Sequence, residues 1–340
     1  MKQILFIVNP ISGNGRREDV ASLVESHLDH TLFEPQVVYT EYAGHAEEIA
    51  ASAANRGVDI VVAVGGDGTV NEVARSLVHT STALAILPCG SGNGLARHLQ
   101  IPMDMERAID IINQDCIHTL DYGRINGLPF FCTCGMGFDA FLSQKFAEAG
   151  KRGLSTYIEK TLTDGLRYKP ETYTITSINS DGNTEEISQK AFLITCANAT
   201  QFGNNAMIAP QASMKDGLLD VIVIEPFLAI ESPAIAIQLF NGTLQRNSRV
   251  KTFKARELTI RRNGEGPVHC DGDPFTTGAD INVQIVPQSF KVVVNPEAKG
   301  HNEKGLMIIG ESLQQWRKQT HRDIKRINKV LLERLRKNKG

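Results

Sequence analysis

Apolar runs alternate with helix-like segments over the first 120 residues. The predicted strands are short runs of apolar or strand-forming residues, at 4–8, 36–40, 59–64 and 83–87. The predicted helices have helical periodicity or are rich in alanine, at 17–29, 45–56 and 70–77. Apolar strands without polar alternation are typical of a parallel sheet covered by helices on both faces. The pattern therefore predicts an N-terminal α/β domain with a parallel sheet, residues 1–123.

A different pattern begins after residue 123. The predicted strands now follow one another, at 128–134, 173–179, 191–197, 218–224, 257–261 and 281–286. One helical region, residues 138–167, interrupts them, and a further strand at 291–294 fits either domain. Successive strands with turn signals such as Asp181-Gly182 are typical of antiparallel sheets. Residues 124–290 are therefore predicted to form a second, mainly antiparallel β domain.

Charge separates residues 311–340 from the rest of the chain. The whole sequence has a net charge of −2, but this segment contains ten Lys or Arg and three Asp or Glu, a net of +7. Its apolar residues recur at spacings of three and four, which predicts a basic amphipathic helix. Such a helix can lie on an anionic membrane, or pack on the protein or on the second subunit of a homodimer. The balanced overall charge argues against nucleic acid as a partner.

Cysteine usage and hydropathy indicate the compartment. The six cysteines follow neither disulfide nor zinc spacing, so we expect reduced cysteines in a cytoplasmic protein. The first apolar run has five residues, too few for the core of a signal peptide. No run approaches the roughly 20 apolar residues of a membrane span. We therefore expect any membrane contact to be peripheral.

Three glycine-rich turns follow predicted strands and precede predicted helices. They read Asn9-Pro10-Ile11-Ser12-Gly13-Asn14-Gly15, Gly65-Gly66-Asp67-Gly68-Thr69-Val70-Asn71-Glu72 and Pro88-Cys89-Gly90-Ser91-Gly92-Asn93-Gly94. The carboxyl ends of parallel strands meet at one edge of a sheet, where ligands bind. Glycines let the backbone approach a phosphate group, and the N–H groups of a helix N-terminus attract anions. Three such turns along one edge predict a polyphosphate site.

The motifs of other nucleotide-binding proteins are missing from the sequence. It contains no Gly-x-x-x-x-Gly-Lys-[Ser/Thr], which excludes a P-loop enzyme. It also contains no Asp-Phe-Gly, so the combined His-Arg-Asp and Asp-Phe-Gly set is absent, which excludes a protein kinase. A dinucleotide-binding dehydrogenase could use Glu41 to hold a ribose, but the first turn lacks the third glycine of that fingerprint.

The three turns, in this order, resemble those of the diacylglycerol kinase catalytic domain. That superfamily contains bacterial lipid kinases, sphingosine kinases and ceramide kinases. The resemblance continues through Gly135-Met136-Gly137-Phe138-Asp139-Ala140, Ile208-Ala209-Pro210, Asp216-Gly217-Leu218-Leu219-Asp220 and Asp271-Gly272-Asp273, over about residues 3–295. It implies an N-terminal domain similar to NAD kinases and phosphofructokinases and a C-terminal β-sandwich. It also implies that the chain returns to the N-terminal domain after about residue 290.

The resemblance implies that ATP and Mg²⁺ bind at the three turns. The implied ATP contacts are Asn9, Pro10, Ser12, Gly13, Thr40, Gly65, Gly66, Asp67, Gly68, Thr69, Asn71, Glu72, Gly90, Ser91 and Asn93. Asp67 lies between glycines, where its carboxylate can face Mg²⁺ or a phosphate-bound water. Without the resemblance, this aspartate is equally consistent with the closure of a tight turn.

The late motif Asp271-Gly272-Asp273 bears on the chemistry. Transfer to a hydroxyl group needs a general base or an orienting carboxylate. The family motif usually reads Asp-Gly-Glu, with that role assigned to its glutamate, so the shorter Asp273 is a departure. Asp273 is then the base, or Asp67 is the base as proposed for sphingosine kinases, or the activity is low. Asp271 is implied to contact the substrate, and a plain hairpin turn is the structural alternative.

Two further positions are implied by the resemblance. Asp216, with the backbone carbonyls of Ser213 and Leu218, would form a structural Mg²⁺ loop, although a plain turn fits nearly as well. Asp139 would hold the lipid head group, as an aspartate does in sphingosine kinases. Its structural alternative is an acidic residue at a helix N-terminus. The third turn lacks the second acidic residue of bacterial diacylglycerol kinases, which leaves the lipid open.

Together these features predict a two-domain lipid kinase. It would transfer the γ-phosphate of ATP, with Mg²⁺, to a hydroxyl of a lipid substrate at a membrane surface. The lipid would be a diacylglycerol, a sphingoid base or a ceramide. A NAD kinase-like enzyme is the alternative among enzymes. A catalytically weak nucleotide- or lipid-binding regulator is the alternative from another class, and the departure at Asp273 is the feature that keeps this alternative open.

Overall fold

The computed structural model describes residues 1–12, 20–149 and 168–298 of the 340-residue chain. Gly13 and the predicted helix at 311–340 therefore lie outside the described residues, as does the predicted helical region beyond residue 149. Within the described part, none of the helices combines the length and the apolar character needed to cross a bilayer.

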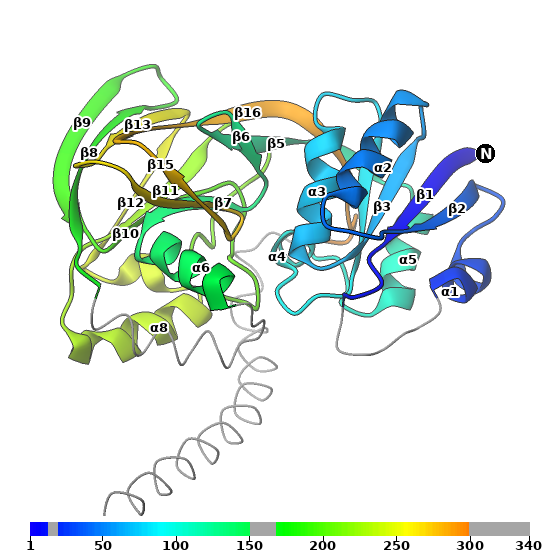
Figure 1. Ribbon diagram of the computed structural model, residues 1–340, viewed down its shortest axis with the longest axis horizontal. Helices are drawn as coiled ribbons and strands as arrows, with labels where there is room; N and C mark the ends of the chain where they lie inside the picture. Colours follow the sequence, from blue (N-terminus) through cyan, green and yellow to red (C-terminus); the bar gives the residue numbers. More distant parts are fainter. Residues whose placement is uncertain (13–19, 150–167, 299–340) are drawn as a thin grey trace, which may run out of the picture.

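Four parallel strands form the centre of the N-terminal domain, in the order β2-β1-β3-β4. They are β1 (Lys2–Val8), β2 (Phe33–Tyr39), β3 (Ile60–Gly65) and β4 (Ala83–Pro88). β3 and β4 are buried along their whole length, because helices cover both faces of the sheet. Figure 1 shows α2 (His45–Asn55) beside α3 (Asp67–Leu77) on one face, and α1 (Val20–His27) beside α5 (Met105–Asn113) on the other. The predicted α/β domain is confirmed.

Two antiparallel sheets form the C-terminal domain. The first contains, in spatial order, β12 (Val250–Ala255), β11 (Leu219–Ile224), β10 (Leu193–Ala197), β7 (Thr133–Gly137), β14 (Gly266–Cys270) and β15 (Asp273–Thr277). The second is the antiparallel part of a ten-stranded sheet that also contains the four parallel strands. In it β9 (Thr184–Ala191), β8 (Glu171–Ile178) and β13 (Glu257–Arg261) lie side by side, and two long strands separate β13 from β6 (Leu128–Phe130). Met136 of the first sheet and Ile175 of the second belong to one buried apolar cluster. The predicted antiparallel β-sandwich is confirmed, although a strand expected at 128–134 is divided between β6 and β7.

Two long strands connect the domains. β5 (Ile117–Ile125) and β16 (Asp280–Val293) pair with each other, and β16 also pairs with β4 through Val292 and Leu84. The chain thus returns to the N-terminal sheet, as expected. The prediction of separate strands at 281–286 and 291–294 is wrong. A bulge between Val286 and Phe290 bends one strand and does not end it.

Two helices cover the outer face of the six-stranded sheet. Figure 1 shows α6 (Phe138–Ala149) and α8 (Ser232–Phe240) along the lower side of the C-terminal domain. Phe138 of α6, Ile222 of β11 and Ile235 of α8 belong to a third buried apolar cluster. The start of α6 agrees with the predicted helical region, whereas α8 is absent from the sequence-based prediction. This third layer places α6 beside the N-terminal domain.

Candidate active site

The first and second glycine-rich turns meet at the carboxyl edge of the parallel sheet. Asn9 follows β1, and its Nδ2 donates a hydrogen bond of 3.0 Å to Oγ1 of Thr69, in the first turn of α3. The backbone N–H of Asn9 also donates to the carbonyl of Val64 in β3, at 3.0 Å. Adjacent parallel strands thus bring the two turns together, as the alternation of strands and helices predicted.

The second and third turns approach so closely that only glycine fits. A Cβ atom at Gly90 would lie 2.6 Å from the Cα of Gly66. A Cβ atom at Gly65 would lie 2.5 Å from the side chain of Thr69. No side chain therefore separates these two turns, and both adjoin the N-terminus of α3. Bare backbone beside a helix N-terminus suits a phosphate group.

Asp67 connects the second turn to the third. Its two carboxylate oxygens accept hydrogen bonds from the backbone N–H groups of Asn93, at 2.8 Å, and Gly94, at 2.7 Å. These N–H groups begin the short helix α4 (Gly94–His98), so Asp67 caps α4 from the first turn of α3. Asn93 in turn accepts a hydrogen bond of 3.1 Å from the N–H of Gly90. Asp67 is therefore fixed at the base of the turns.

The remaining predicted nucleotide contacts lie on or beside the same turns. Thr40 follows β2, and its N–H donates to the carbonyl of Val8 at 2.9 Å. The side chains differ in exposure: Pro10, Gly68 and Ser91 are exposed, whereas Ser12, Thr40 and Glu72 are half-buried. The structure thus brings the described members of the predicted set to one edge of the sheet.

A cavity of about 270 Å³ lies between the two domains, next to these turns. From the N-terminal domain it is lined by Asp67, Val70, Asn71 and Leu95. From the C-terminal domain it is lined by Cys132, Thr133, Asp139, Leu142, Ser143, Phe202, His269, Asp271 and Gly272. Asp67, Asp139 and Asp271, which come from three distant motifs, therefore border the same space.

Asp139 and His269 form a buried pair on the C-terminal side of the cavity. Oδ2 of Asp139 lies 3.2 Å from Nε2 of His269 and accepts a hydrogen bond of 2.9 Å from the hydroxyl of Thr195. Nδ1 of His269 accepts from the N–H of Gly272 at 3.3 Å, so the ring proton lies on Nε2 and faces Asp139. Sequence reasoning missed His269. Its one available signal is its position two residues before the Asp271 motif.

Asp271 is enclosed by backbone donors. Its carboxylate accepts hydrogen bonds of 2.7, 2.7 and 2.8 Å from the N–H groups of Phe131, Cys132 and Thr133. Removal of this carboxylate from water raises the pKa of Asp271 to about 6, and the three N–H donors offset only part of that effect. Asp271 therefore joins the β6–β7 connection to the 271–273 turn and builds one wall of the cavity.

Asp273 lies beside the cavity and not on its wall. Its side chain is 66% exposed, and its Oδ2 lies 3.7 Å from the guanidinium group of Arg75. Arg75 follows Asp67 and Asn71 along one face of α3, because residues four apart lie above one another on a helix. The ion pair between Arg75 and Asp273 therefore connects the two domains next to the cavity.

In the predicted Mg²⁺ loop, the ammonium group of Lys254 already pairs with the Asp216 carboxylate. One oxygen of Asp216 accepts from Nζ of Lys254 at 2.8 Å, and the other accepts from the N–H of Leu218 at 3.1 Å. Lys254 also lies 2.9 Å from Asp220. Burial by itself would lower the pKa of Lys254, but the two carboxylates raise it overall. Asp216, with Ser213 and Leu218, does not fit a resident Mg²⁺ in this arrangement, because the ammonium group neutralises the carboxylate.

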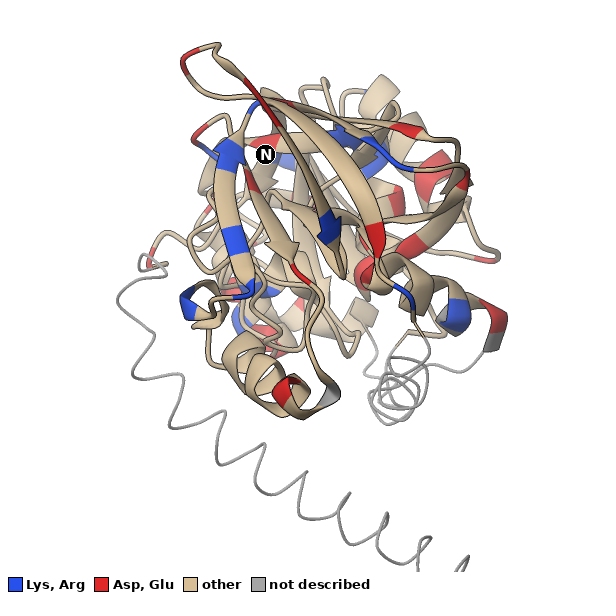
Figure 2. Ribbon diagram, turned by 90° about the vertical axis from the view of Figure 1, so that its left-hand side faces the viewer, with Lys and Arg blue, Asp and Glu red and all other residues tan. Residues whose placement is uncertain are grey.

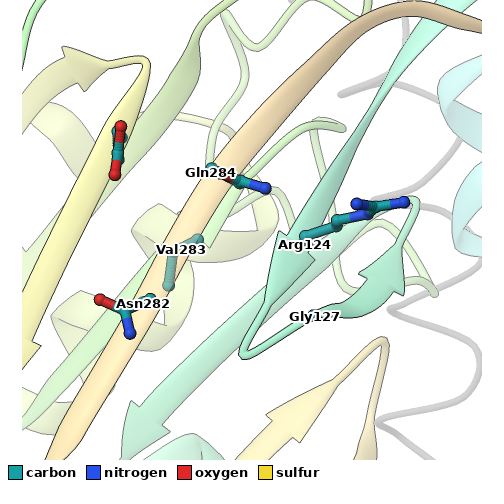
Figure 3. Close-up of a pocket in the computed structure, with 6 residues that line it drawn as sticks. Arg124, Gly127, Asn282, Val283 and Gln284 are labelled. Atoms are coloured by element: carbon teal, nitrogen blue, oxygen red, sulfur yellow. The ribbon is translucent and has the colours of Figure 1, made fainter.

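A second hollow, of about 110 Å³, lies on the C-terminal domain (Figure 3). It is lined by residues of β5, β13 and β16 and of the β5–β6 turn, namely Arg124, Gly127, Glu257, Asn282, Val283 and Gln284. No predicted site residue borders it. The cavity between the domains is therefore the candidate active site.

The fold and the site define a two-domain protein in which an α/β domain with phosphate-type turns faces a β-sandwich across a cavity. The model of the diacylglycerol kinase catalytic domain matches residues 3–125. The model of the YegS C-terminal NAD kinase beta sandwich-like domain matches residues 133–294. The N-terminal part of the chain therefore belongs to the diacylglycerol kinase catalytic domain family, and the C-terminal part belongs to the YegS C-terminal domain family.

Curated relatives and a solved structure agree with this family. A diacylglycerol kinase of Mycobacterium tuberculosis is 27% identical over 298 residues, which are 86% of this chain and 94% of that protein. A probable YegS-like lipid kinase of Stenotrophomonas maltophilia is 29% identical over 72% of this chain and 81% of its own. The crystal structure of a diacylglycerol kinase from Bacillus anthracis covers 87% of this chain and 97% of its own, with a TM-score of 0.66 and 22% identity. The last likeness concerns the fold alone.

Proposed function

We propose that this protein is an ATP-dependent lipid kinase, which transfers the γ-phosphoryl group of ATP to a hydroxyl of a membrane lipid from the cytoplasmic side. One observation carries the proposal. Asp67 and Asn71, from the glycine-rich motif suited to phosphate, line the same cavity as the carboxylates Asp139 and Asp271 of the other domain. Membership of the family and the names of the relatives support the same class.

ATP would bind at the three turns on the edge of the parallel sheet. The fit rests on the glycine cradle, since a side chain at Gly90 would fill the space beside Gly66. The N-terminus of α3 favours negative charge at the same place. Mg²⁺, when bound with ATP, supplies charge neutralisation on the phosphoryl oxygens. Asp67 is the carboxylate at these turns, and one or two carboxylates with water are the usual protein ligands of such an ion.

The lipid would enter the cavity from the C-terminal domain. A volume of about 270 Å³ is below that of typical drug-sized sites, so it suits a polar head group and not the acyl chains. Asp139 offers carboxylate oxygens that can each accept a further hydrogen bond from the hydroxyl or amino groups of such a head group, and His269 holds that carboxylate in place. Leu142 and Phe202 offer apolar surface where the hydrocarbon chain begins.

We assign Asp273 as the general base. Asp67, Asp139 and Asp271 hold both of their oxygens on N–H or O–H donors. Asp273 is instead 66% exposed, and an exposed carboxylate can turn toward the hydroxyl of a bound lipid. Arg75 lies 3.7 Å from it and holds this carboxylate beside the cavity.

A radiolabelled-ATP assay against parallel acceptors tests the proposed function. The purified full chain would receive labelled ATP and Mg²⁺ with micelles of diacylglycerol, sphingosine, dihydrosphingosine or ceramide, or with soluble NAD. We expect label in one class of lipid. Label in NAD alone would replace the lipid kinase by a NAD kinase-like enzyme. Binding of ATP without label in any acceptor would favour a nucleotide-binding regulator.

A further inference from the structure

Helix α8 is apolar on all sides, yet one of its faces is exposed. Its sequence, Ser-Pro-Ala-Ile-Ala-Ile-Gln-Leu-Phe, contains no charged residue. Ile235 and Leu239 pack inward on the apolar cluster that covers the six-stranded sheet. Ile237 and Phe240 are 59% and 41% exposed. A helix that is hydrophobic all round is normally buried, so we expect the outer face of α8 to contact an apolar partner.

The exposed surface continues into the turn before α8. Leu228 is 67% exposed, and Ile230, in the 3₁₀ turn η1 (Ala229–Glu231), is 84% exposed. We call Leu228, Ile230, Ile237 and Phe240 the α8 patch. Single exposed apolar residues are common on proteins, but a group of large ones within one short segment marks an interaction surface.

The charges beside the α8 patch suit a phospholipid surface. Glu231 pairs with Arg249 at 3.2 Å, and Glu225 pairs with Lys251 at 2.7 Å. Arg246, in the turn η2 (Leu244–Arg246) that follows α8, is exposed. Figure 2 shows basic residues on the strand and turns near this end of the domain. The two ion pairs cancel, so Arg246 leaves a net charge of +1 among these five residues. An apolar surface with positive charge at its border complements an anionic bilayer.

One loop connects the α8 patch to the active-site cavity. The N–H of Met207 donates a hydrogen bond of 2.9 Å to the carbonyl of Leu239, near the end of α8. In the same loop Phe202 lines the cavity, and the N–H of Asn204 donates to the carbonyl of Gly92, in the third turn, at 3.1 Å. Phe202 and Leu239 also belong to one apolar cluster. Apolar side chains therefore lead from α8 to the site of the proposed reaction.

We propose that the α8 patch docks this protein on a phospholipid bilayer, with Ile230 and Ile237 inserted among the acyl chains and α8 lying in the interface. The inference rests on the proposed lipid kinase function, which requires the cavity to receive a lipid from a bilayer. Docking through α8 brings the apolar path to the cavity against the membrane surface. A second copy of this chain and the basic segment 311–340 are the rival occupants, and the experiment separates them.

Vesicle co-sedimentation of the full chain, without ATP, tests the docking. The vesicles contain phosphatidylglycerol and phosphatidylcholine. The test variant carries Ile230→Asp and Ile237→Asp. The control carries Leu128→Asp and Ile187→Asp, at residues 48% and 37% exposed on strands of the other sheet. We expect the test variant to bind about ten-fold more weakly than wild type and the control to stay within about two-fold. Thermal unfolding checks that both variants are folded.

Four results would overturn the proposal. The first is absence of vesicle binding by the wild-type chain, and the second is an equal loss of binding in both double variants. The third is binding that disappears when residues 311–340 are deleted and is unchanged by the α8 substitutions. The fourth is a wild-type dimer that the α8 substitutions convert to monomers, with no vesicle binding by either form.

Activity separates the docking from the proposed function. The α8 variant should lose phosphorylation of vesicle-borne diacylglycerol and keep phosphorylation of water-soluble dioctanoylglycerol. Equal loss on both substrates would contradict a docking role. If the binding results are as expected but the wild type phosphorylates no lipid, the docking surface stands and the lipid kinase function fails.

Discussion

Four aspartates around one cavity have different surroundings, and these surroundings indicate a different role for each. Asp67 and Asp271 are held by backbone N–H groups, so they fix the turns that carry them. Asp139 is paired with His269 and is suited to hold a polar head group. Asp273 is exposed at the edge and is suited to meet an incoming hydroxyl. Residue type alone would not distinguish these four carboxylates.

The raised pKa of Asp271 predicts a pH-dependent contribution to stability. Its pKa is about 6 in the folded chain, against roughly 3.9 for an unfolded aspartate. The folded chain therefore binds the extra proton between these values, so this contribution is present below about pH 4 and is lost as the pH rises through 6. Asp271→Asn removes the titration. Relative to wild type, the variant should gain up to about 3 kcal/mol between pH 4 and pH 7.

Urea unfolding of both proteins from pH 4 to pH 7 measures this difference in the free energy of unfolding. The constant cost of replacing a carboxyl oxygen by an amide nitrogen cancels in the comparison. A difference that stays the same across this range, or that falls with rising pH, would contradict the assignment of a raised pKa to Asp271.

Substitution of Asp273 tests its assignment as the base. Asp273→Asn should lower kcat by about 10²-fold or more, since general-base catalysis contributes at least that much, and should leave the affinity for ATP unchanged. Asp273→Glu, which restores a carboxylate, should keep much of the activity. Asp280→Asn is the matched control, because Asp280 is also an exposed aspartate, paired with Arg261 at 2.7 Å. A kcat for Asp273→Asn within two-fold of wild type would transfer the role of base to Asp67.

The sequence predicted the carboxylates of the site and not their partners. Asp67, Asp139 and Asp271 stand in recognisable motifs, and the structure brings them to one cavity. His269 stands in no motif, and its pairing with Asp139 arises from the packing of α6 against β14. The sequence did not indicate a role for Arg75 either, because its neighbour Asp273 comes from the other domain. Contacts between residues far apart in the chain are set by tertiary structure, which periodicity does not describe.

At the scale of elements, predictions succeeded where a strand or helix has its own pattern. The parallel strands β1, β3 and β4 are apolar runs that end at or near glycine, asparagine or proline, and all four parallel strands were predicted to within a few residues. β9 (Thr184–Ala191) was missed because it is exposed along most of its length and has no apolar run. Helix α4 was missed because it is only five residues long and is capped by Asp67 from another element.

The 213–218 loop provides a prediction about metal dependence. Because Lys254 neutralises Asp216 and Asp220, added Mg²⁺ or EDTA should not change the melting temperature of the wild-type chain. Lys254→Met leaves two carboxylates facing each other and should cost about 1 kcal/mol, part of which added Mg²⁺ should restore. Thermal unfolding with and without MgCl₂ measures both effects. Lys251→Met, which removes a lysine paired with Glu225 on the same strand, is the control and should not respond to Mg²⁺.

Destabilisation of the wild-type chain by EDTA would contradict this account of the loop. It would mean that a divalent ion displaces the Lys254 ammonium in solution. The predicted ligands Ser213, Asp216 and Leu218 would then regain the role that the family resemblance implied.

At the scale of the molecule, the site exists because the chain crosses between the domains more than once. β5 and β16 run from one domain into the other, and β16 ends in the N-terminal sheet. This arrangement sets α6 and the 271–273 turn opposite α3, so that each domain provides half of the cavity. Neither domain has both the phosphate-type turns and the Asp139–His269 pair. The account therefore predicts that phosphoryl transfer depends on residues of both domains.

The most direct test of the central claim is the initial rate of phosphoryl transfer from labelled ATP to lipid by wild type and by Asp67→Asn. Asp110→Asn, on the exposed side of α5, is the control. The account predicts transfer by wild type and by the control, and a loss of about 10²-fold or more in Asp67→Asn, because Asp67 both joins the turns and faces the phosphate site. Transfer at nearly the wild-type rate by Asp67→Asn, or ATP binding by wild type without transfer to any lipid, would contradict it.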